Sequence, residues 1–231
     1  MVIIEGNRRN VKGNTELQAI YRNRFGPRLE YRRRVWATLC AKFWSQFIPE
    51  DSSVLDLGCG YGEFINQIRC HRKWAIDFNP TTRQYLDSSI TFLEQDCSMP
   101  WSLPDESLDV VFTSNFFEHL PDKDTLRRTL AQTHRCLRKS GLLIAMGPNI
   151  RYLPGSYWDF WDHQLPITDK SLREALQITG FKVEKQFARF LPYSMAEGPT
   201  YPIWLVSIYL SLFWLWPFFG KQFLVVARKS Q

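Results

Sequence analysis

The chain has 231 residues, of which 45% are hydrophobic and 23% are charged. These values indicate one sizeable globular domain, or at most two small ones, and exclude a disordered, collagen-like or disulfide-scaffold protein. The five cysteines are scattered and form no C-x-x-C pair, which favours a reducing cytosol over a disulfide framework or a zinc site. The N-terminus turns polar too early for a secretory signal, so we expect a cytoplasmic location.

Positive charge is concentrated near the N-terminus. Residues 1–42 contain ten Lys and Arg but only three acidic residues, and the net charge of the whole chain is +6. The N-terminal segment therefore carries the entire excess of positive charge. This predicts either a basic face for phosphates, nucleic acid or an anionic membrane surface, or simply a solvated helix face.

The first predicted elements are helical. Apolar spacing between Leu17 and Phe47 predicts helices with a break near Gly26-Pro27. A short apolar strand follows at Ser53–Leu57 and ends in a glycine-rich turn. After this turn, Glu63–Ile68 has helical spacing. The order is therefore strand, glycine turn and helix.

Further short apolar runs alternate with helix-like stretches. They predict strands at Trp74–Ile76, Ile90–Leu93, Leu108–Phe112, Leu142–Met146, Phe181–Phe187 and Gln222–Lys229. Helices are predicted at Thr125–Leu137 and Lys170–Thr179. This alternation is typical of an α/β fold with a mostly parallel sheet covered by helices.

The chain divides into four predicted regions. Residues 1–50 form a basic helical segment, and residues 51–191 form the α/β core. Residues 192–220 form a hydrophobic insertion, and residues 221–231 contain the last strand and the tail.

A D-x-G-x-G-x-G sequence follows the first strand, over residues 56–62. Glycines allow a sharp turn and a close approach of the backbone to a ligand. The third glycine comes one residue earlier than in the dinucleotide fingerprint, and an acid precedes the first, so a ligand that carries a cation fits better than a pyrophosphate. The candidate binding residues here are Asp56, Gly58, Cys59, Gly60 and Tyr61.

Two more acids follow later strands. Asp77 ends the second strand, where a carboxylate can accept both ribose hydroxyls, and Phe78 beside it offers a face for adenine. Asp96 follows the third strand and can accept from an exocyclic amine, with the Cys97 backbone nearby. Taken singly, a strand-end aspartate is often only a helix cap. In order and in register, the acids and the glycine turn indicate a nucleotide-like ligand.

The run from Val54 to Gly62 resembles the first motif of the class I S-adenosylmethionine-dependent methyltransferases. Asp77 and Asp96 resemble the ribose-binding and adenine-binding acids of that family. The resemblance covers roughly residues 52–185 and the last strand. It implies a Rossmann-like, seven-stranded sheet with an antiparallel last strand, S-adenosyl-L-methionine as cofactor, and methyl transfer by direct displacement. It does not identify the methyl acceptor.

His119 follows the fourth strand, at the sheet edge where ligands bind, and titrates near neutrality. It is the first candidate for a general base, the alternative being a residue that only shapes the cleft. The order Asn115-x-x-Glu118-His119 resembles the E-x-x-E-H metal motif of small-RNA 2′-O-methyltransferases and some quinone O-methyltransferases. Asn115 replaces the first acid, which weakens a site for a hard divalent ion, so we expect no metal. Asn115 itself is a candidate for the cofactor site.

A second polar and aromatic cluster, between Asn149 and Thr168, follows the fifth strand. Such a loop suits a sugar or another ring-bearing acceptor, and it resembles a stretch of bacterial methyltransferases associated with polysaccharide and lipid-linked glycan assembly. His163 is therefore the second catalytic candidate. The alternative for Asp162 and His163 is a packed turn that leads into a capped helix at Thr168.

The segment Ile203–Phe219 is the most hydrophobic part of the chain, with fourteen apolar or aromatic residues in seventeen. Seventeen residues are the lower limit for a membrane-spanning helix, and a span would separate the last strand from the sheet. We therefore expect a monotopic or re-entrant helix with its Trp residues at the headgroup level, held against anionic lipid by the basic N-terminus. The alternative is burial in a core or in a homodimer.

These features predict a methyltransferase peripheral to the membrane that acts on a glycan or a lipid-linked acceptor. The alternatives are a quinone or small-molecule O- or C-methyltransferase, a non-catalytic cofactor-binding subunit, and a nucleic-acid-binding module. Nucleic acid is disfavoured because Asp56, Asp77 and Asp96 would repel a phosphate backbone.

Overall fold

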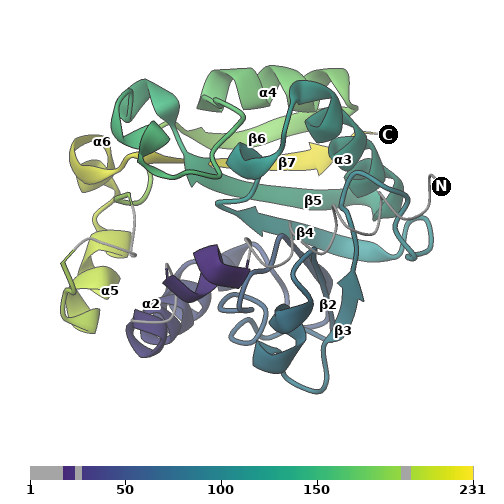
Figure 1. Cartoon of the computed structure of the whole chain (residues 1–231), viewed down its shortest axis with the longest axis horizontal. Coiled ribbons are helices and arrows are strands. Elements are labelled where there is room, and N and C mark those ends of the chain that lie inside the picture. Colours follow the sequence, from purple (N-terminus) through teal and green to yellow (C-terminus); the bar gives the residue numbers. More distant parts are fainter. Residues whose placement is uncertain (1–17, 24–27, 194–198, 231) are drawn as a thin grey trace.

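The computed structural model describes residues 18–23, 28–193 and 199–230, so the predicted break near Gly26-Pro27 lies outside the described residues. One seven-stranded sheet runs through the protein in the order β3-β2-β1-β4-β5-β7-β6 (Figure 1). Its strands are β1 Ser53–Leu57, β2 Arg72–Asp77, β3 Thr91–Glu94, β4 Leu108–Ser114, β5 Leu137–Pro148, β6 Phe181–Phe187 and β7 Gln222–Lys229.

The pairing pattern confirms the Rossmann-like prediction. β1, β2, β3, β4 and β5 pair in parallel, whereas β7 lies antiparallel to both β5 and β6. All seven predicted strands are present, several of them longer than predicted. A parallel sheet brings the carboxyl ends of its strands to one edge, and this is the edge where α/β proteins bind ligands.

Helices cover both faces of the sheet. Residues 18–23 are helical, and the further α-helices are α2 Leu29–Lys42, α3 Lys123–Cys136, α4 Asp169–Ile178, α5 Ile203–Ser211 and α6 Trp216–Phe219. The predicted helices within the core correspond to α3 and α4, with ends that differ by one or two residues. The start predicted at Thr168 is confirmed, because its side chain accepts from the Ser171 N–H in a capping box.

Several short 3₁₀ helices connect these elements. They are η2 Trp44–Gln46, η3 Pro80–Tyr85, η4 Phe117–His119, η5 Ile150–Tyr152, η6 Ser156–Asp159 and η7 Phe213–Leu215. Of these, η4 matters most for the site, because it follows β4 at the carboxyl edge of the sheet.

Two apolar clusters sandwich the sheet. Successive residues of a strand point to opposite faces, so Val54 packs with α2 and α5 while Leu55 packs with α3 and α4. Val110 and Val111 of β4 divide in the same way. Figure 1 shows α3 and α4 on one side of the sheet and α2 and α5 on the other.

The predicted helix at Glu63–Ile68 is wrong. These residues form hydrogen-bonded turns, with one bond from the Asn66 N–H to the Gly62 carbonyl and another from the Ile68 N–H to the Phe64 carbonyl. A segment this short gains little from helix propagation. Its apolar side chains still pack into the core, so their spacing reflects which side chains are buried and not a helical backbone.

The hydrophobic insertion is three short helices rather than the single helix we expected. α5 ends at Ser211, and η7 and α6 follow as separate turns, with Pro217 in the first turn of α6. The Trp216 indole N–H donates to the Tyr209 carbonyl at 3.1 Å and so folds α6 back onto α5. Within the described ranges, no helix is long and apolar enough to cross a membrane.

Candidate functional site

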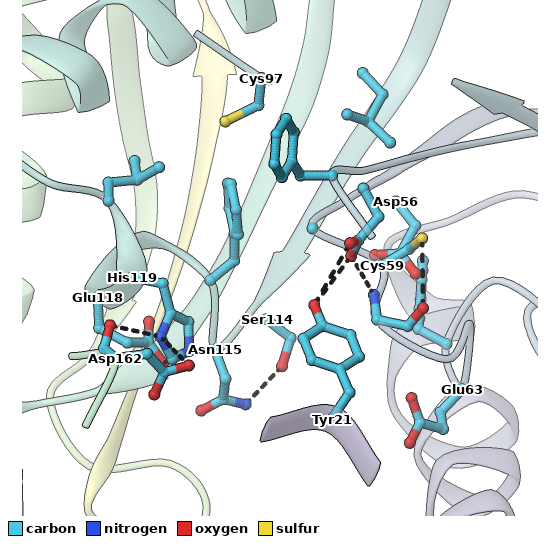
Figure 2. A pocket seen from close by; sticks show the side chains of 18 of the residues that line it. Tyr21, Asp56, Cys59, Glu63, Cys97, Ser114, Asn115, Glu118, His119 and Asp162 are labelled. Atoms are coloured by element: carbon cyan, nitrogen blue, oxygen red, sulfur yellow. Dashed lines mark hydrogen bonds and ion pairs between the residues drawn. The ribbon is translucent and has the colours of Figure 1, made fainter. Parts of the chain in front are cut away.

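A cavity of about 470 Å³ opens at the carboxyl ends of the central strands. Nine of the predicted cofactor-binding residues line it, namely Asp56, Gly58, Cys59, Gly60, Asp77, Phe78, Asp96, Cys97 and Asn115. Both predicted catalytic residues, His119 and His163, line it as well. In Figure 2, Glu118, His119 and Asp162 group on one side of the cavity, and Tyr21, Asp56, Cys59 and Glu63 on the other.

The glycine turn holds its conformation through contacts that a side chain would disrupt. Gly58 and Gly60 have φ of 70° and 56°, in the left-handed region that favours glycine. The Gly58 and Cys59 N–H groups both donate to the Ile76 carbonyl of β2. A Cβ on Gly58 would lie 2.3 Å from the Phe116 ring, whereas at Gly60 it would meet nothing closer than Tyr21 at 4.0 Å. Backbone at Gly60 is therefore open to a ligand.

Asp77 is buried and held by backbone donors. Its Oδ2 accepts from the Gly60 N–H at 2.8 Å, and its Oδ1 accepts from the Asn79 N–H at 2.9 Å. Burial raises the pKa of Asp77 to about 6, although these hydrogen bonds lower it. A hydroxyl donor at this carboxylate would stabilise its ionised form, as the prediction of a ribose-binding acid requires.

Negative charge accumulates beside the turn. Burial raises the pKa of Asp56 well above its usual value, and the charges of Glu63 and Asp77 raise it further. Arg32 of α2 offsets part of this charge through an ion pair of 2.7 Å with Glu63. A cationic ligand would relieve the repulsion among these acids, and this fits the cation-carrying ligand predicted from the motif.

The adenine-binding prediction rests on three residues that follow strands β2 and β3, namely Phe78, Asp96 and Cys97. Phe78 is 42% exposed and lines the cavity, so its ring is accessible. One Asp96 oxygen accepts from the Ser98 N–H at 2.8 Å, which shows that this acid also stabilises a local turn. Cys97 is buried, and burial raises the pKa of its thiol to about 12, so it is a neutral packing group.

Tyr61 does not line the cavity, unlike the other residues predicted to bind the cofactor. Its ring stacks on Tyr85 at 3.9 Å and meets Tyr21 edge-on at 5.6 Å. The residue belongs to the turn but is buried between these two tyrosines, outside the cavity lining. A position inside a motif therefore did not ensure a place in the cavity wall.

The opposite wall carries the histidines. His119 in η4 directs Nδ1 toward Asp162, 3.2 Å from the carboxylate and 3.1 Å from the backbone carbonyl. Its Nε2 lies 4.0 Å from a Glu118 oxygen. The ring of His163 meets that of His119 edge-on, with centroids 4.9 Å apart. The loop after β5 therefore brings His163 to the end of β4.

Three of these residues have the donor types and spacing of a metal site. Glu118, His119 and His163 each offer one ligand atom, and these atoms lie within 4.8 Å of one another. Asn115, which occupies the first position of the motif in the sequence, adopts a φ of 51° and donates from its amide to the Ser114 hydroxyl.

Much of the predicted polar cluster after β5 is structural. Asn149 is fully buried and bridges Asp169 and the Ala188 carbonyl. Tyr157 is buried and donates to the Leu165 carbonyl at 2.5 Å. Trp161 is 84% exposed. The cluster contributes Phe160, Asp162, His163 and Gln164 to the cavity wall.

Several cavity residues were not singled out from the sequence. Tyr21, Arg32 and Trp36 come from the basic N-terminal segment, where charge and helical spacing gave no sign of a cleft. Gln222 begins β7 and reaches the cavity from the far end of the chain. Glu63 directly follows the last glycine of the motif, and this adjacency was the one available signal.

The residues present fit S-adenosyl-L-methionine. The Trp36 indole N–H is buried in the cavity wall, and among the described residues no acceptor bonds to it, so it can serve a ligand carboxylate. Open backbone at Gly60, the acids around Asp56 and the carboxylate of Asp77 suit the remaining polar groups of such a cofactor.

Comparison with curated proteins finds methyltransferases. A probable S-adenosylmethionine-dependent methyltransferase of Mycobacterium tuberculosis is 31% identical over 63% of this chain and 52% of its own length. A 2-methyl-6-phytyl-1,4-hydroquinone methyltransferase of Synechocystis is 28% identical over 70% of this chain and 55% of its own length. This chain thus spans about half the length of these relatives.

Solved structures share the fold. An S-adenosylmethionine-dependent methyltransferase from Archaeoglobus fulgidus has a TM-score of 0.62 and 22% identity, and the match covers 86% of this chain and 94% of that one. A second from Mesorhizobium loti has a TM-score of 0.56 and 17% identity, with 80% and 94% covered. The family described as a methyltransferase domain matches residues 28–186. The chain belongs to this family of S-adenosylmethionine-dependent methyltransferases.

Proposed function

We propose that this chain transfers a methyl group from S-adenosyl-L-methionine to a hydroxyl of a glycan or lipid-linked acceptor at a membrane surface. One observation carries the proposal: a single cavity joins the glycine turn and its acids to the His119–His163 wall. The two halves of a transfer reaction, a donor site and an acceptor site, would then lie in one cavity.

The donor side of the cavity supplies binding and orientation. S-adenosyl-L-methionine supplies a methyl carbon bonded to a positively charged sulfur. Asp77 would accept from the ribose hydroxyls, and Asp96 with Phe78 would hold the adenine. Asp56 and Glu63 would stabilise positive charge, and the pKa of Asp56 would fall as a cation replaces water beside it.

The acceptor side of the cavity supplies activation. A hydroxyl is a weak nucleophile and must lose its proton as the new bond forms. Asp162 orients the imidazole of His119 through Nδ1, and we propose that His119 takes part in activating the acceptor hydroxyl. Phe160 and Tyr193 contribute apolar wall at this end and would exclude water around a ring-bearing acceptor.

The insertion supports the membrane part of the proposal. Trp204, Phe213, Trp214, Phe218 and Phe219 are each more than half exposed, although each is large and hydrophobic. Such a concentration of exposed aromatic rings on short helices is typical of a surface that enters the membrane interface.

Basic residues accompany this aromatic surface. α5 lies beside α2 in Figure 1, and the Tyr31 hydroxyl of α2 accepts from the Tyr201 N–H just before α5. α2 exposes Arg33, Arg34 and Lys42. Positive charge next to exposed aromatic rings favours anionic lipid.

Incubation with labelled S-adenosyl-L-methionine and a membrane-lipid extract tests the activity. We expect label in a lipid-linked glycan fraction, and we expect Asp77→Ala to abolish it. Asp87→Ala is the matched control, because Asp87 is exposed and outside the cavity. If wild-type protein binds no labelled cofactor, the proposed activity is wrong.

Sedimentation with lipid vesicles tests the docking. Wild-type protein should sediment with vesicles that contain phosphatidylglycerol and less with pure phosphatidylcholine. The double variant Phe213→Ser/Phe218→Ser should stay in the supernatant. Ile178→Ser is the control, because Ile178 is 74% exposed on α4, away from the insertion. Equal sedimentation of the double variant and the wild type would contradict docking through α5 and α6.

A lipid hydroquinone is the second candidate acceptor. It is favoured by the Synechocystis relative, whose name specifies a phytyl-substituted hydroquinone and whose match covers 70% of this chain. Such a ring also offers a hydroxyl and an apolar tail. Chromatography that separates quinones from glycolipids in the same labelled extract distinguishes the two acceptors.

A further inference from the structure

We infer that Glu118, His119 and His163 bind a divalent transition-metal ion at the acceptor end of the cavity. The inference rests on the proposed function only in the role it gives the ion, which is to activate the methyl acceptor. It departs from the sequence-based expectation, in which Asn115 in the first motif position argued against a metal.

The donor atoms come from two separate parts of the chain. Glu118 and His119 lie in η4, directly after β4, while His163 lies in the loop after β5. Their ligand atoms are within 4.8 Å of one another, so shifts of roughly an ångström would place all three about 2.0 to 2.2 Å from one ion. Glu118 and His163 are buried, and His119 is 24% exposed.

The backbone also holds the cluster together. The Glu118 carbonyl accepts from the Gln164 and Leu165 N–H groups at 2.8 and 3.0 Å. These two bonds fix the loop that contains His163 against η4. The three donors are therefore positioned by main-chain contacts, as a binding site requires.

Asp162 gives His119 the orientation of a metal ligand. Histidines that bind metals usually donate their second ring N–H to a carboxylate or a carbonyl, which fixes the tautomer and raises the basicity of the ligating nitrogen. Here Nδ1 of His119 faces both the carboxylate and the carbonyl of Asp162, and Nε2 faces Glu118. Asp162 is thus a positioning residue for the site.

The donor set selects the class of ion. Two imidazole nitrogens and one carboxylate suit first-row transition ions, whereas Mg²⁺ and Ca²⁺ prefer a shell of oxygens. Three protein ligands also leave a coordination position for a substrate. Methyl transfer exchanges no electrons with the metal, so a redox-inert ion such as Zn²⁺ is sufficient.

The ion would act as a Lewis acid on the acceptor. Coordination of the acceptor hydroxyl lowers its pKa, and the proton passes to water. The oxygen then forms a bond to the methyl carbon as the bond from carbon to sulfur breaks, and sulfur keeps the electron pair. The cofactor loses its positive charge in this step, and the methylated product is released from the ion.

Titration with Co²⁺ tests the site without relying on activity. Protein stripped of metal with a chelator should develop visible ligand-field absorption that saturates at one equivalent of Co²⁺ and disappears when Zn²⁺ is added. His163→Gln and Glu118→Gln should each weaken Co²⁺ binding by about tenfold or more. Asp162→Asn should weaken it by about tenfold, while His71→Gln, at an exposed histidine, should have no effect.

The outcomes separate this inference from the proposed function. Absence of the absorption, or equal Co²⁺ affinity in His163→Gln and His71→Gln, overturns the metal site. Thermal unfolding of each variant shows whether weaker binding merely reflects a damaged fold. Methyl transfer that persists in chelator-treated protein but is lost in His119→Gln would overturn the role given to the ion, while the proposed methyl transfer would stand with His119 as its base. Cobalt binding by a protein that binds no cofactor would support the metal site and overturn the proposed methyl transfer.

Discussion

The Tyr21 hydroxyl lies 3.3 Å from Oδ2 of Asp77, the same oxygen that accepts the Gly60 N–H. The N-terminal segment thus contacts the acid proposed to bind ribose. Each carboxylate oxygen accepts about two hydrogen bonds, so a ribose hydroxyl and the Tyr21 hydroxyl compete for the same acceptor.

Replacing Tyr21 with phenylalanine should therefore tighten cofactor binding. Loss of a competing hydrogen bond of about 1 kcal/mol predicts an increase in affinity of about fivefold. Calorimetry with S-adenosyl-L-methionine measures it, with Tyr201→Phe as a control at an exposed tyrosine that does not line the cavity. Weaker binding by Tyr21→Phe would show that Tyr21 covers the bound cofactor instead of competing with it.

Cofactor affinity should fall in acid because of Asp77. Burial raises its pKa to about 6, and ribose hydroxyls donate best to the ionised carboxylate. Affinity should therefore decrease as the pH drops through about 6, by at most about tenfold per pH unit. Calorimetry between about pH 5 and pH 8 measures the profile, and Asp77→Asn should flatten this component.

In the absence of cofactor, the raised pKa of Asp77 should make the folded protein more stable in acid, whereas cofactor affinity falls there. The folded protein binds the Asp77 proton more tightly than the unfolded chain does, whose pKa is near 3.8. The stabilising contribution is therefore complete below about pH 4 and is lost as the pH rises to about 6. Urea unfolding without cofactor checks this sign, and Asp56 should act in the same direction, since its pKa is also raised by burial.

Two glycines of the motif should respond differently to alanine. At Gly58 the new Cβ would lie 2.3 Å from the Phe116 ring, so Gly58→Ala should cost about 2 to 4 kcal/mol of stability. At Gly60 there is space, and the cost should be about 1 kcal/mol, from the left-handed backbone alone.

Cofactor affinity should be affected more by Gly60→Ala than by Gly58→Ala, the opposite of the order expected for stability. Gly60→Ala places a methyl group where the backbone is open to the cavity, so it should lose cofactor affinity by about tenfold or more while remaining folded. Urea unfolding and calorimetry on both variants test the pair. Unchanged affinity in Gly60→Ala would move the cofactor away from this turn.

Asn149 should matter for stability and not for cofactor binding. Its amide bridges the buried Asp169 carboxylate at 2.8 Å and the Ala188 carbonyl at 3.0 Å. Asn149→Ala leaves both acceptors short of a donor inside the protein, which should cost about 2 to 4 kcal/mol. Urea unfolding measures the loss. A large change in cofactor affinity at unchanged stability would instead place Asn149 in the site.

The donor side of the site could be predicted from sequence because its signals are local. The glycines after β1 and the acids at the ends of β2 and β3 lie next to strands whose apolar runs are easily recognised. A parallel sheet necessarily brings such strand ends to one edge, so order along the chain was enough to predict a shared cleft. The helix predicted at Glu63–Ile68 was wrong, because buried apolar side chains in a series of turns have the same spacing as in a helix.

Only the tertiary structure decided the acceptor side and the N-terminal contacts. The meeting of His163 with Glu118 and His119 depends on how the loop after β5 crosses the end of β4, and Tyr21 reaches Asp77 across a long separation in sequence. The spacing of apolar residues along the sequence does not predict such contacts, because they arise from loop paths and packing between distant segments. The sequence by itself determined the fold, the family and the strand-end acids, whereas tertiary packing determined which side chains face one another across the cavity.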